Sequence, residues 1–324
     1  MSAKTALITG ALGQDGRLLA GHLLKVGYRV IGLAKPGTPF PAEGILAAMQ
    51  REQCSLADAP AVCRMLDEWQ PDEIYHLAAV HHSSQEHAAG QSGVLQEAML
   101  TGNFLSTKTL AFAMLETRSP AHLVFAASSQ MFSADSKDRR IDEHSLRNPR
   151  TFYGHLKSWA MELLTFLRTD RGLRASSAIL FNHESPLRRQ QFVSRKISRA
   201  AALAKLGQPF NMTLQNLAAR VDWSSARDVV RALHLMGCAT GADDYVVASG
   251  QLHSVEQMLS AAFAHAGLDW HDFVNAGHRH AAPALSGCAV KLREKLGWQP
   301  VMTFNGMIGE MVDHDLADMA CEEH

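Results

Sequence analysis

The sequence predicts an α/β protein with a doubly wound parallel sheet and a smaller C-terminal region. Strand-like and helix-like stretches alternate through the first half of the chain, as parallel strands with helical crossovers require. The chain opens with an apolar run at residues 6–8, a glycine-rich turn and a stretch with leucines at helical spacing. Beyond residue 181 the alternation gives way to helical stretches joined by short polar links.

The composition is that of an ordinary globular protein. Of the 324 residues, 47% are hydrophobic and 19% are charged. The formal net charge of −1 gives no electrostatic reason to expect nucleic acid or an anionic membrane as a partner. No apolar run approaches the ~18 residues of a membrane span. The five cysteines lack Cys-x-x-Cys spacing, which favours reduced thiols and a cytoplasmic location.

The first half is expected to form a Rossmann-like dinucleotide-binding domain over residues 1–181. Short apolar runs are interpreted as buried strands, and longer stretches with apolar residues at helical spacing as the helices between them. After the first helix, the predicted elements are strand Arg29–Leu33, helix Pro60–Glu68, strand Glu73–Leu77, helix Val94–Leu115, strand His122–Phe125, helix Tyr153–Thr169 and strand Ser176–Leu180.

Residues 182–324 are expected to form a smaller, mainly helical region that closes over the first domain and binds substrate. The boundary is soft, because the chain is expected to return to the sheet near Tyr245–Val247. The predicted helices of this region are Val193–Lys205, Ala226–Met236, Val255–Ala266 and Phe304–Ala317.

The turn at Thr9–Gly16 predicts a dinucleotide site. Gly10 permits a tight turn, Gly13 lets the backbone approach a pyrophosphate, and Gly16 lets the helix pack closely on the strand. The start of the helix then offers unpaired N–H groups to the phosphates. The second predicted strand is followed by Lys35 where NAD-binding units usually place an acidic residue, which favours NADP, with NAD as the alternative.

Tyr153 and Lys157 stand four residues apart, on one face of a predicted helix. A tyrosine has a pKa of ~10, and a neighbouring ammonium together with a positive nicotinamide ring is expected to lower it. Tyr153 could then take a proton from a substrate hydroxyl as hydride leaves. Ser128, just after a predicted strand, could orient the reacting oxygen. The glycine turn, the serine and the Tyr–Lys pair together predict nicotinamide chemistry.

Several longer motifs extend this pattern over nearly the whole chain. With them the sequence resembles the extended short-chain dehydrogenase/reductase family and, within it, the GDP-mannose 4,6-dehydratases. The segment Asn-His-Glu-Ser-Pro with the following Arg-Lys run is the most specific of the motifs. The matching stretches are Thr9–Gly16, Gln70–Tyr75, Leu77–Ala79, Leu180–Pro186, Phe192–Ala200, Glu294–Pro300 and Glu310–Val312.

The resemblance implies a role for each matching residue. The catalytic threonine of the family corresponds to Ser128, and its tyrosine and lysine to Tyr153 and Lys157. It implies a homodimer or homotetramer paired through the helices at 94–115 and 153–169, and a nucleotide-diphosphate sugar, GDP-mannose or a derivative, as substrate. Cofactor contacts are expected from Gly10, Leu12, Gly13, Gln14, Asp15, Gly16, Lys35, Leu77, Ala78, Ala79, Tyr153, Lys157, His183 and Arg195. Substrate contacts are expected from His81, His82, Asn182, Val193, Lys196 and Arg220.

Gln130 is the main departure from the family. The dehydratases have at this position a catalytic glutamate that removes the C5 proton of the sugar, and an amide cannot act as a base. Three hypotheses stay open. A dehydratase could use His81 or His82 as the base, a 4-keto-sugar reductase or C4 epimerase would need no elimination, and a silent paralogue would bind cofactor without turnover.

Other charged residues carry no assigned chemistry. Arg188 and Arg189 are interpreted as a solvated turn, with contact to a diphosphate as the alternative. His81-His82 and His278-x-His280 lack a carboxylate or cysteine partner at metal-ligand spacing, so no metal site is expected.

Overall fold

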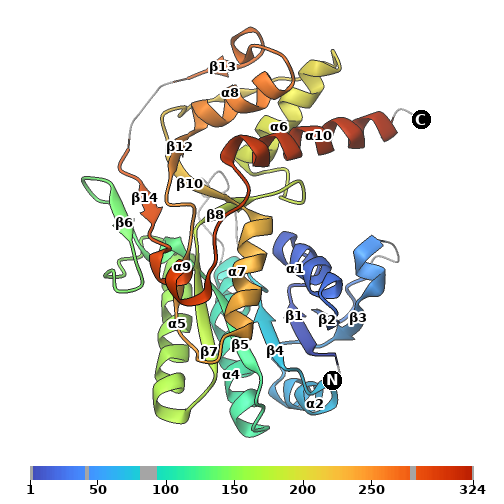
Figure 1. Cartoon of the computed structure of the whole chain (residues 1–324), viewed down its shortest axis with the longest axis vertical. Helices are drawn as coiled ribbons and strands as arrows, with labels where there is room; N and C mark the ends of the chain where they lie inside the picture. The colour runs from blue at the N-terminus through green and yellow to red at the C-terminus, as the bar shows by residue number, and fades with distance from the viewer. Residues whose placement is uncertain (1–2, 41–43, 81–92, 278–281, 323–324) are drawn as a thin grey trace.

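The computed structural model describes residues 3–40, 44–80, 93–277 and 282–322, and a parallel sheet of seven strands forms its centre (Figure 1). The strand order is β11-β7-β5-β4-β1-β2-β3. Because the order reverses between β1 and β4, a crevice is expected at their carboxyl ends. The strands are β1 (Thr5–Thr9), β2 (Arg29–Ala34), β3 (Gln50–Gln53), β4 (Glu73–His76), β5 (His122–Ser128), β7 (Ala175–Leu180) and β11 (Tyr245–Val247).

Helices cover both faces of this sheet, which confirms the predicted doubly wound α/β class. One face packs against α1 (Gln14–Lys25), α7 (Ala226–Cys238) and α9 (Val290–Leu296). The other face packs against α2 (Ala59–Trp69), α4 (Ser106–Glu116) and α5 (Phe152–Arg171). Apart from the polar edge strand β3, the strands are therefore largely buried on both sides, as their mostly apolar sequences require.

The stretch predicted as one helix at 94–115 is interrupted. It consists of α3 (Gly93–Leu100), a π-helical turn at Thr101–Leu105 and α4. Within the turn, the Asn103 amide accepts from the Val80 N–H at 3.2 Å and donates to the Val80 carbonyl at 2.9 Å. The turn thus fastens the helix to the segment that leaves β4.

Besides the two hydrophobic cores on the faces of the sheet, a third lies beyond it, among helices of the C-terminal region. It joins α6 (Val193–Lys205), α8 (Val255–His265) and α10 (Phe304–Glu322) around the buried Trp223 (Figure 1). The short elements of this part and of the connecting segments are β6 (Arg139–Ile141), β8 (Asn182–Glu184), β9 (Thr213–Leu214), β10 (Arg220–Ser225), β12 (Leu252–Ser254), β13 (Asn275–Ala276), β14 (Leu285–Gly287), and 3-10 turns at Gly44–Ala48, Ser129–Met131 and Trp270–Asp272.

Asp222 ties three segments of this region together. Its buried carboxylate accepts from the N–H groups of Ser249, Gly250 and Gly287 at 2.9–3.0 Å, and from the Ser249 hydroxyl at 2.5 Å. β14 in turn pairs with β6, so residues near 140 and 286 are held side by side. Four donors compensate the cost of burying this carboxylate.

Most predicted elements are found with shifts of one to three residues at their ends. Helix α6 has the predicted bounds, and Tyr245–Val247 returns to the sheet by pairing with β7. Strand β3, with the sequence Gln-Arg-Glu-Gln, was not predicted, because a polar edge strand carries no apolar pattern.

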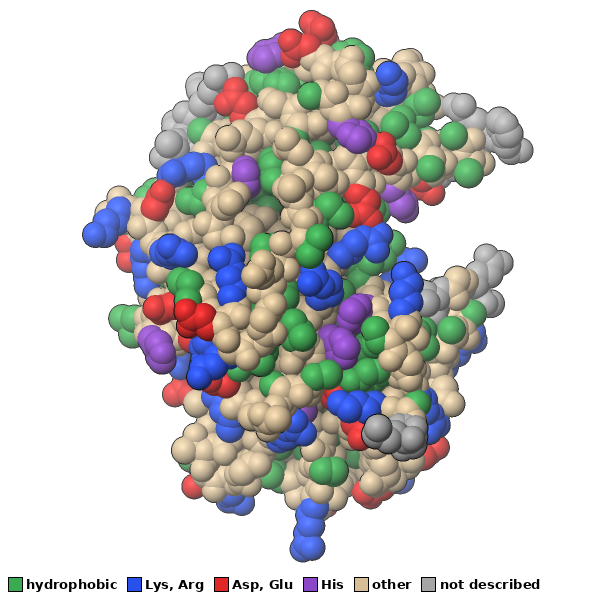
Figure 2. Space-filling model, viewed as in Figure 1, with side chains coloured by type: hydrophobic (Ala, Val, Ile, Leu, Met, Phe, Trp, Pro, Cys, Tyr) green, Lys and Arg blue, Asp and Glu red, His purple; other side chains and the backbone are tan. Residues whose placement is uncertain are grey.

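None of the helices in the described part of the chain is long and apolar enough to cross a membrane. Acidic and basic side chains are interspersed over the face shown in Figure 2, in keeping with the near-zero net charge.

Candidate active site

A cleft of about 1170 Å³ lies at the carboxyl ends of the central strands. Both halves of the chain contribute to its walls, since residues 10–193 line one part and residues 213–255 the other. The side nearer the sheet is formed by Gly10, Leu12, Gly13, Gln14, Asp15, Gly16, Leu77, Ala79, Ala126, Ala127, Ser128, Ser129, Gln130, Tyr153 and Lys157. This is the position at which doubly wound sheets hold their ligands.

The glycine turn has the geometry that a pyrophosphate cradle needs. Gly10 has a φ of +71°, and a Cβ there would lie 2.8 Å from the backbone nitrogen of Ala78. A Cβ at Gly16 would overlap the carbonyl oxygen of Gly10. Helix α1 begins at Gln14, so its unpaired N–H groups stand at the cleft. The chain therefore offers backbone where a dinucleotide phosphate would come closest, and the site fits such a cofactor.

The segment after β4 forms the adjoining wall. Leu77 and Ala79 line the cleft, whereas the Ala78 N–H donates to the Thr9 hydroxyl at 3.1 Å. Thr9 is also hydrogen-bonded to Nδ1 of His76 at 2.8 Å, which holds the ends of β1 and β4 together. Lys35 is exposed immediately after β2 and does not line the cleft.

Ser128, Tyr153 and Lys157 meet at the centre of the cleft, as their spacing predicts. Ser128 ends β5, and Thr151 caps α5 by accepting the Gly154 N–H at 3.0 Å. The Tyr153 and Ser128 side chains are hydrogen-bonded. The Lys157 ammonium nitrogen donates to the Ala126 carbonyl at 2.8 Å and lies 5.6 Å from the centroid of the Tyr153 ring.

Gly154 allows α5 to come this close to the end of β5. A Cβ at this position would overlap the carbonyl oxygen of Gln130. The tyrosine and the serine can therefore touch only because a glycine follows the tyrosine.

Burial controls the protonation of the two titratable groups. It raises the pKa of Tyr153, against the opposing effects of the Arg188 charge and the Ser128 hydrogen bond. It lowers the pKa of Lys157 to about 7. With the groups of the protein alone, Tyr153 is thus a protonated phenol. Desolvation outweighs the Arg188 charge and the Ser128 hydrogen bond, and the lowering of this pKa expected with a positive nicotinamide ring in place stays a prediction.

Gln130 lines the same cleft. Its side-chain Oε1 accepts from the Thr151 hydroxyl at 3.1 Å, and its backbone N–H donates to the Ser128 hydroxyl at 3.2 Å. Among the described residues that line the cleft, the carboxylates are Asp15 and Glu184, and each has other partners. A neutral amide therefore occupies the position at which the sequence comparison expected an acid–base group.

Asp15 and His183 form a buried ion pair at the edge of the glycine turn. The Asp15 carboxylate lies 2.9 Å from Nε2 of His183, and Nδ1 of the same ring donates to the Phe181 carbonyl at 2.7 Å. Burial opposes ionisation of both groups, but their mutual attraction and hydrogen bond leave the pKa of His183 raised and that of Asp15 lowered. The imidazole is therefore a cation with both nitrogens satisfied.

Gln14 makes a second bridge to the same segment. Its Oε1 accepts from the Ser185 hydroxyl at 2.9 Å, and its Nε2 donates to the His183 carbonyl at 3.3 Å. Gln14, Asp15 and His183 were expected to contact a cofactor. They do line the cleft, and the structure shows in addition that they join the two motifs to each other.

Arg188, rather than Arg195, presents its charge to the cleft. Arg195 is 4% exposed, forms an ion pair of 2.6 Å with Asp315 inside the helical core and does not line the cleft, and its expected cofactor contact stays a prediction. The Arg188 guanidinium lines the cleft, stacks 3.7 Å from the centroid of the Phe192 ring and lies 3.2 Å from the Glu184 carboxylate. The sequence interpretation of Arg188 as part of a solvated turn had contact to a diphosphate as its alternative, and that contact stays a prediction.

The residues expected to contact substrate separate into three groups. Asn182 and Val193 line the cleft. Lys196 and Arg220 do not line it, so their expected substrate contacts stay predictions, and Arg220 forms two hydrogen bonds of 2.9 Å with Asp138. His81 and His82 lie outside the described residues, as do His278 and His280. Residues of the far wall that sequence reasoning missed are Thr213, Leu214, Gln215, Asn216, Ala219, Trp223 and Val255.

Comparison with known proteins gives a consistent result. A family model described as GDP-mannose 4,6 dehydratase matches residues 7–311. GDP-mannose 4,6 dehydratase 2 of Arabidopsis thaliana is 36% identical over 331 residues, which cover 97% of this chain and 87% of the relative.

Two solved structures share the fold over 97% of this chain. RMD from Pseudomonas aeruginosa, complexed with NADPH, has a TM-score of 0.80 at 19% identity and is covered over 100% of its length. UDP-glucose 4-epimerase from Brucella ovis, in complex with NAD, has a TM-score of 0.81 at 20% identity and is covered over 99%. At these identities the likeness concerns the fold.

Proposed function

Because the chain belongs to the GDP-mannose 4,6 dehydratase family, we propose that it transfers hydride between an NADP cofactor and C4 of a nucleotide-diphosphate hexose, GDP-mannose or a derivative. The family places it among the nucleotide-sugar dehydratase and epimerase enzymes. The observation that carries the proposal is the contact of Tyr153 with Ser128, beside Lys157, in a cleft that begins at the glycine turn.

The cofactor would be held by the protein backbone around Gly10–Gly16 and by the wall at Leu77–Ala79. The Arg188 guanidinium is the cleft cation best placed to meet a phosphate. When bound, the nicotinamide supplies the hydride acceptor or donor. NADP is proposed over NAD because the exposed Lys35 follows β2, where a 2′-phosphate would need a cation and a 2′-hydroxyl a carboxylate.

Four side chains of the cleft would orient the reacting oxygen and control the transfer of its proton. The Ser128 hydroxyl hydrogen-bonds the C4 oxygen and keeps it within reach of the Tyr153 phenol. In the reducing direction the protonated Tyr153 donates its proton to that oxygen. In the oxidising direction the phenolate must form first, and the charges of Lys157 and Arg188 stabilise it.

Gln130 decides whether elimination follows oxidation at C4. A 4,6-dehydratase must remove the C5 proton, and the amide held by Thr151 has no basic atom for it. Family membership favours the dehydratase, with His81 or His82 as the base, and is the first candidate. The amide favours the second candidate, a 4-keto-sugar reductase or C4 epimerase, whose chemistry ends with the hydride on C4 and the proton on the C4 oxygen.

Product analysis separates the candidates. Purified protein is incubated with NADP⁺ and GDP-mannose, and the formation of a 4-keto-6-deoxy product is followed by mass spectrometry. A dehydratase gives the product without help, whereas a reductase gives none but oxidises NADPH when a 4-keto-6-deoxy nucleotide sugar is supplied. Gln130→Glu is expected to increase elimination about 10²–10⁴-fold if the missing base limits the reaction.

Tyr153→Phe is the control for hydride chemistry in both cases. It removes the phenolic proton and is expected to abolish NADPH consumption while cofactor binding persists. Cofactor binding by the wild type without either activity would refute the enzymatic proposal and support a silent paralogue.

We further propose that the protein is a homodimer, or a dimer of dimers, paired through α4 and α5. Three large apolar side chains on these helices are exposed: Phe112 by 46%, Trp159 by 47% and Phe166 by 55%. A second copy covering them would remove this apolar surface from water. Phe166→Glu is expected to shift the protein to monomer in light scattering, whereas Val301→Glu, at an exposed site outside these helices, is not.

A further inference from the structure

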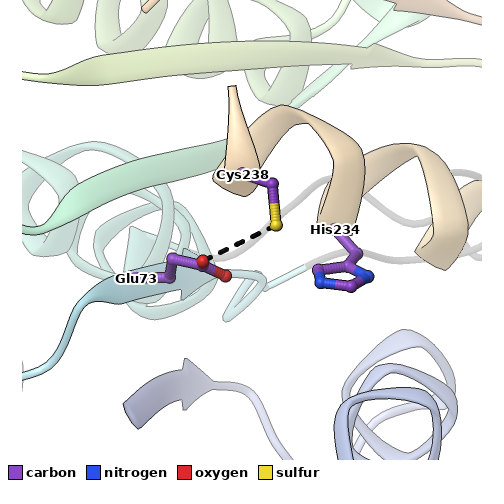
Figure 3. A group of neighbouring side chains, drawn as sticks. All are labelled: Glu73, His234 and Cys238. Carbon is purple, nitrogen blue, oxygen red and sulfur yellow. Dashed lines mark hydrogen bonds between the residues drawn. The ribbon is translucent and has the colours of Figure 1, made fainter. Parts of the chain in front are cut away.

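A cluster of potential metal ligands lies at the amino-terminal end of the sheet, away from the cleft. Glu73 begins β4, and His234 and Cys238 stand one turn apart near the end of α7 (Figure 3). One carboxylate oxygen, one imidazole nitrogen and the sulfur lie within 4.8 Å of one another. The cleft is at the opposite ends of the strands, so these groups take no part in the proposed chemistry.

We propose that Glu73, His234 and Cys238 bind a single zinc-type ion, a thiophilic divalent cation. Thiolate, imidazole and carboxylate are the three ligand types of protein zinc sites, and two ligands four residues apart on a helix face the same side. Ligand atoms ~2.0–2.3 Å from a tetrahedral ion stand about 3.5 Å apart. The Cys238 sulfur and the Glu73 oxygen are 3.8 Å apart, close to this value.

The Tyr28 hydroxyl occupies the fourth corner. It lies 2.9 Å from the Glu73 carboxylate, 3.3 Å from Nε2 of His234 and 3.4 Å from the Cys238 sulfur. The phenol donates its one proton to Glu73, and its oxygen can accept from Nε2 of His234 or from the Cys238 thiol. With an ion at the centre, all four atoms face one positive charge, and the thiol proton leaves to solvent.

Two further side chains hold the ligands in orientation. His22 is hydrogen-bonded through its Nε2 to Nδ1 of His234 at 2.9 Å, which turns Nε2 of His234 toward the cluster. The buried Tyr75 donates to the second oxygen of Glu73 at 2.6 Å. Such outer partners fix the ring and carboxylate that bind a metal.

The site is open to solvent, and a lysine competes with the ion for one of its ligand atoms. Cys238 is exposed, and Figure 2 shows histidine side chains at the surface where α1 lies against α7. The Lys4 ammonium lies 3.0 Å from the same Glu73 oxygen, and its side chain is 51% exposed. Lysine and metal would compete for one oxygen, and the flexible lysine can withdraw into water at little cost.

A bound ion would link β4 and α7 to Tyr28, the residue just before β2. Cobalt and zinc titrations of the chelator-treated full chain test this. We expect one ion per chain, a thiolate-to-cobalt charge-transfer absorption with Co²⁺, and a higher unfolding temperature with Zn²⁺. Cys238→Ser removes the absorption and the temperature shift, whereas Cys321→Ser, at another exposed thiol, keeps both.

Two milder variants keep the test valid if Cys238→Ser folds poorly. Lys4→Gln removes the competing cation and is expected to raise zinc affinity several-fold. His22→Gln is expected to lower it about 10–100-fold without abolishing it. A wild-type chain that binds no equimolar Zn²⁺, or a Co²⁺ absorption that survives Cys238→Ser, would overturn the proposal. None of these readouts depends on the proposed enzymatic activity.

Discussion

Replacing Asp15 by asparagine tests the reasoning on the buried ion pair with His183. Asparagine keeps an oxygen that accepts from the imidazole but removes the negative charge, leaving a cation in the wall of the cleft. Breaking a buried pair by removing one partner costs ~3–5 kcal/mol. The Asp15 and His183 side chains are 22% and 11% exposed, and the hydrogen bond survives. We therefore expect a loss of about 2 kcal/mol in the free energy of unfolding.

The loss must depend on pH in one direction. The raised pKa of His183 contributes stability that is complete below the ordinary value of 6.5 and disappears as pH rises through the raised value. The lowered pKa of Asp15 contributes stability that is complete above 3.8 and disappears as pH falls through the lowered value. Both contributions are present between 3.8 and 6.5, so the variant should differ most from the wild type there.

Urea unfolding followed by circular dichroism, at a pH of about 5 and again near 9, measures this difference. Asp135→Asn is the matched control, because Asp135 pairs with Arg150 in the open, with the two side chains 59% and 70% exposed. No measurable change is expected from it. A loss below about 1 kcal/mol for Asp15→Asn at the lower pH, or an equal loss at both pH values, would refute the reasoning.

Three further changes follow from the described geometry. The pKa of Lys157 is lowered from 10.5 to about 7, so the folded protein should gain stability as the pH rises between these two values. The unfolding temperature of Lys157→Met should lack this gain. Unfolding temperatures of wild type and variant that change in parallel with pH would contradict the prediction. Gly16→Ala forces a Cβ into the backbone of the turn and should weaken NADP binding at least tenfold in a fluorescence titration, whereas Gly241→Ala, with open space around it, should not. Lys35→Asp should shift the ratio of NADP to NAD affinity at least tenfold toward NAD, measured against Lys25→Asp as a control for charge alone.

Local patterns were sufficient to predict the sheet and the centre of the cleft. The glycine turn and the Tyr153–Lys157 pair depend on short-range geometry, because a turn or a helical face is fixed by residues a few positions apart. Strand β3 could not be found in this way, since its polar residues are held by the edge of the sheet and not by an apolar face.

Contacts between distant segments account for what was missed. From the sequence alone, Arg188 and Arg195 are equally good candidates for a cation in the cleft. Only the packing of α6 on α10 shows that Asp315 pairs with Arg195 inside the core. The Glu73 cluster joins Glu73 to His234, which lies 161 positions further along (from residue 73 to residue 234), so the local spacing of His234 and Cys238 could not reveal the third ligand. The raised pKa of Tyr153 in the protein alone depends on burial, which a sequence motif does not reveal.

The return of β11 to the sheet has a consequence for how the chain folds. Residues 245–247 complete the edge beside β7, and Asp244 next to them accepts from Arg168 at 2.8 Å and from the N–H of Ser177 at 3.0 Å. During synthesis β7 therefore has an unpaired edge until some 65 further residues have been added. The part of the sheet that α7 covers also stays exposed until that helix has been made. Open edges of this kind invite pairing between chains. A fragment that stops at residue 181 should thus aggregate, and chaperone demand should be greatest while the segment from 181 to 247 is being made.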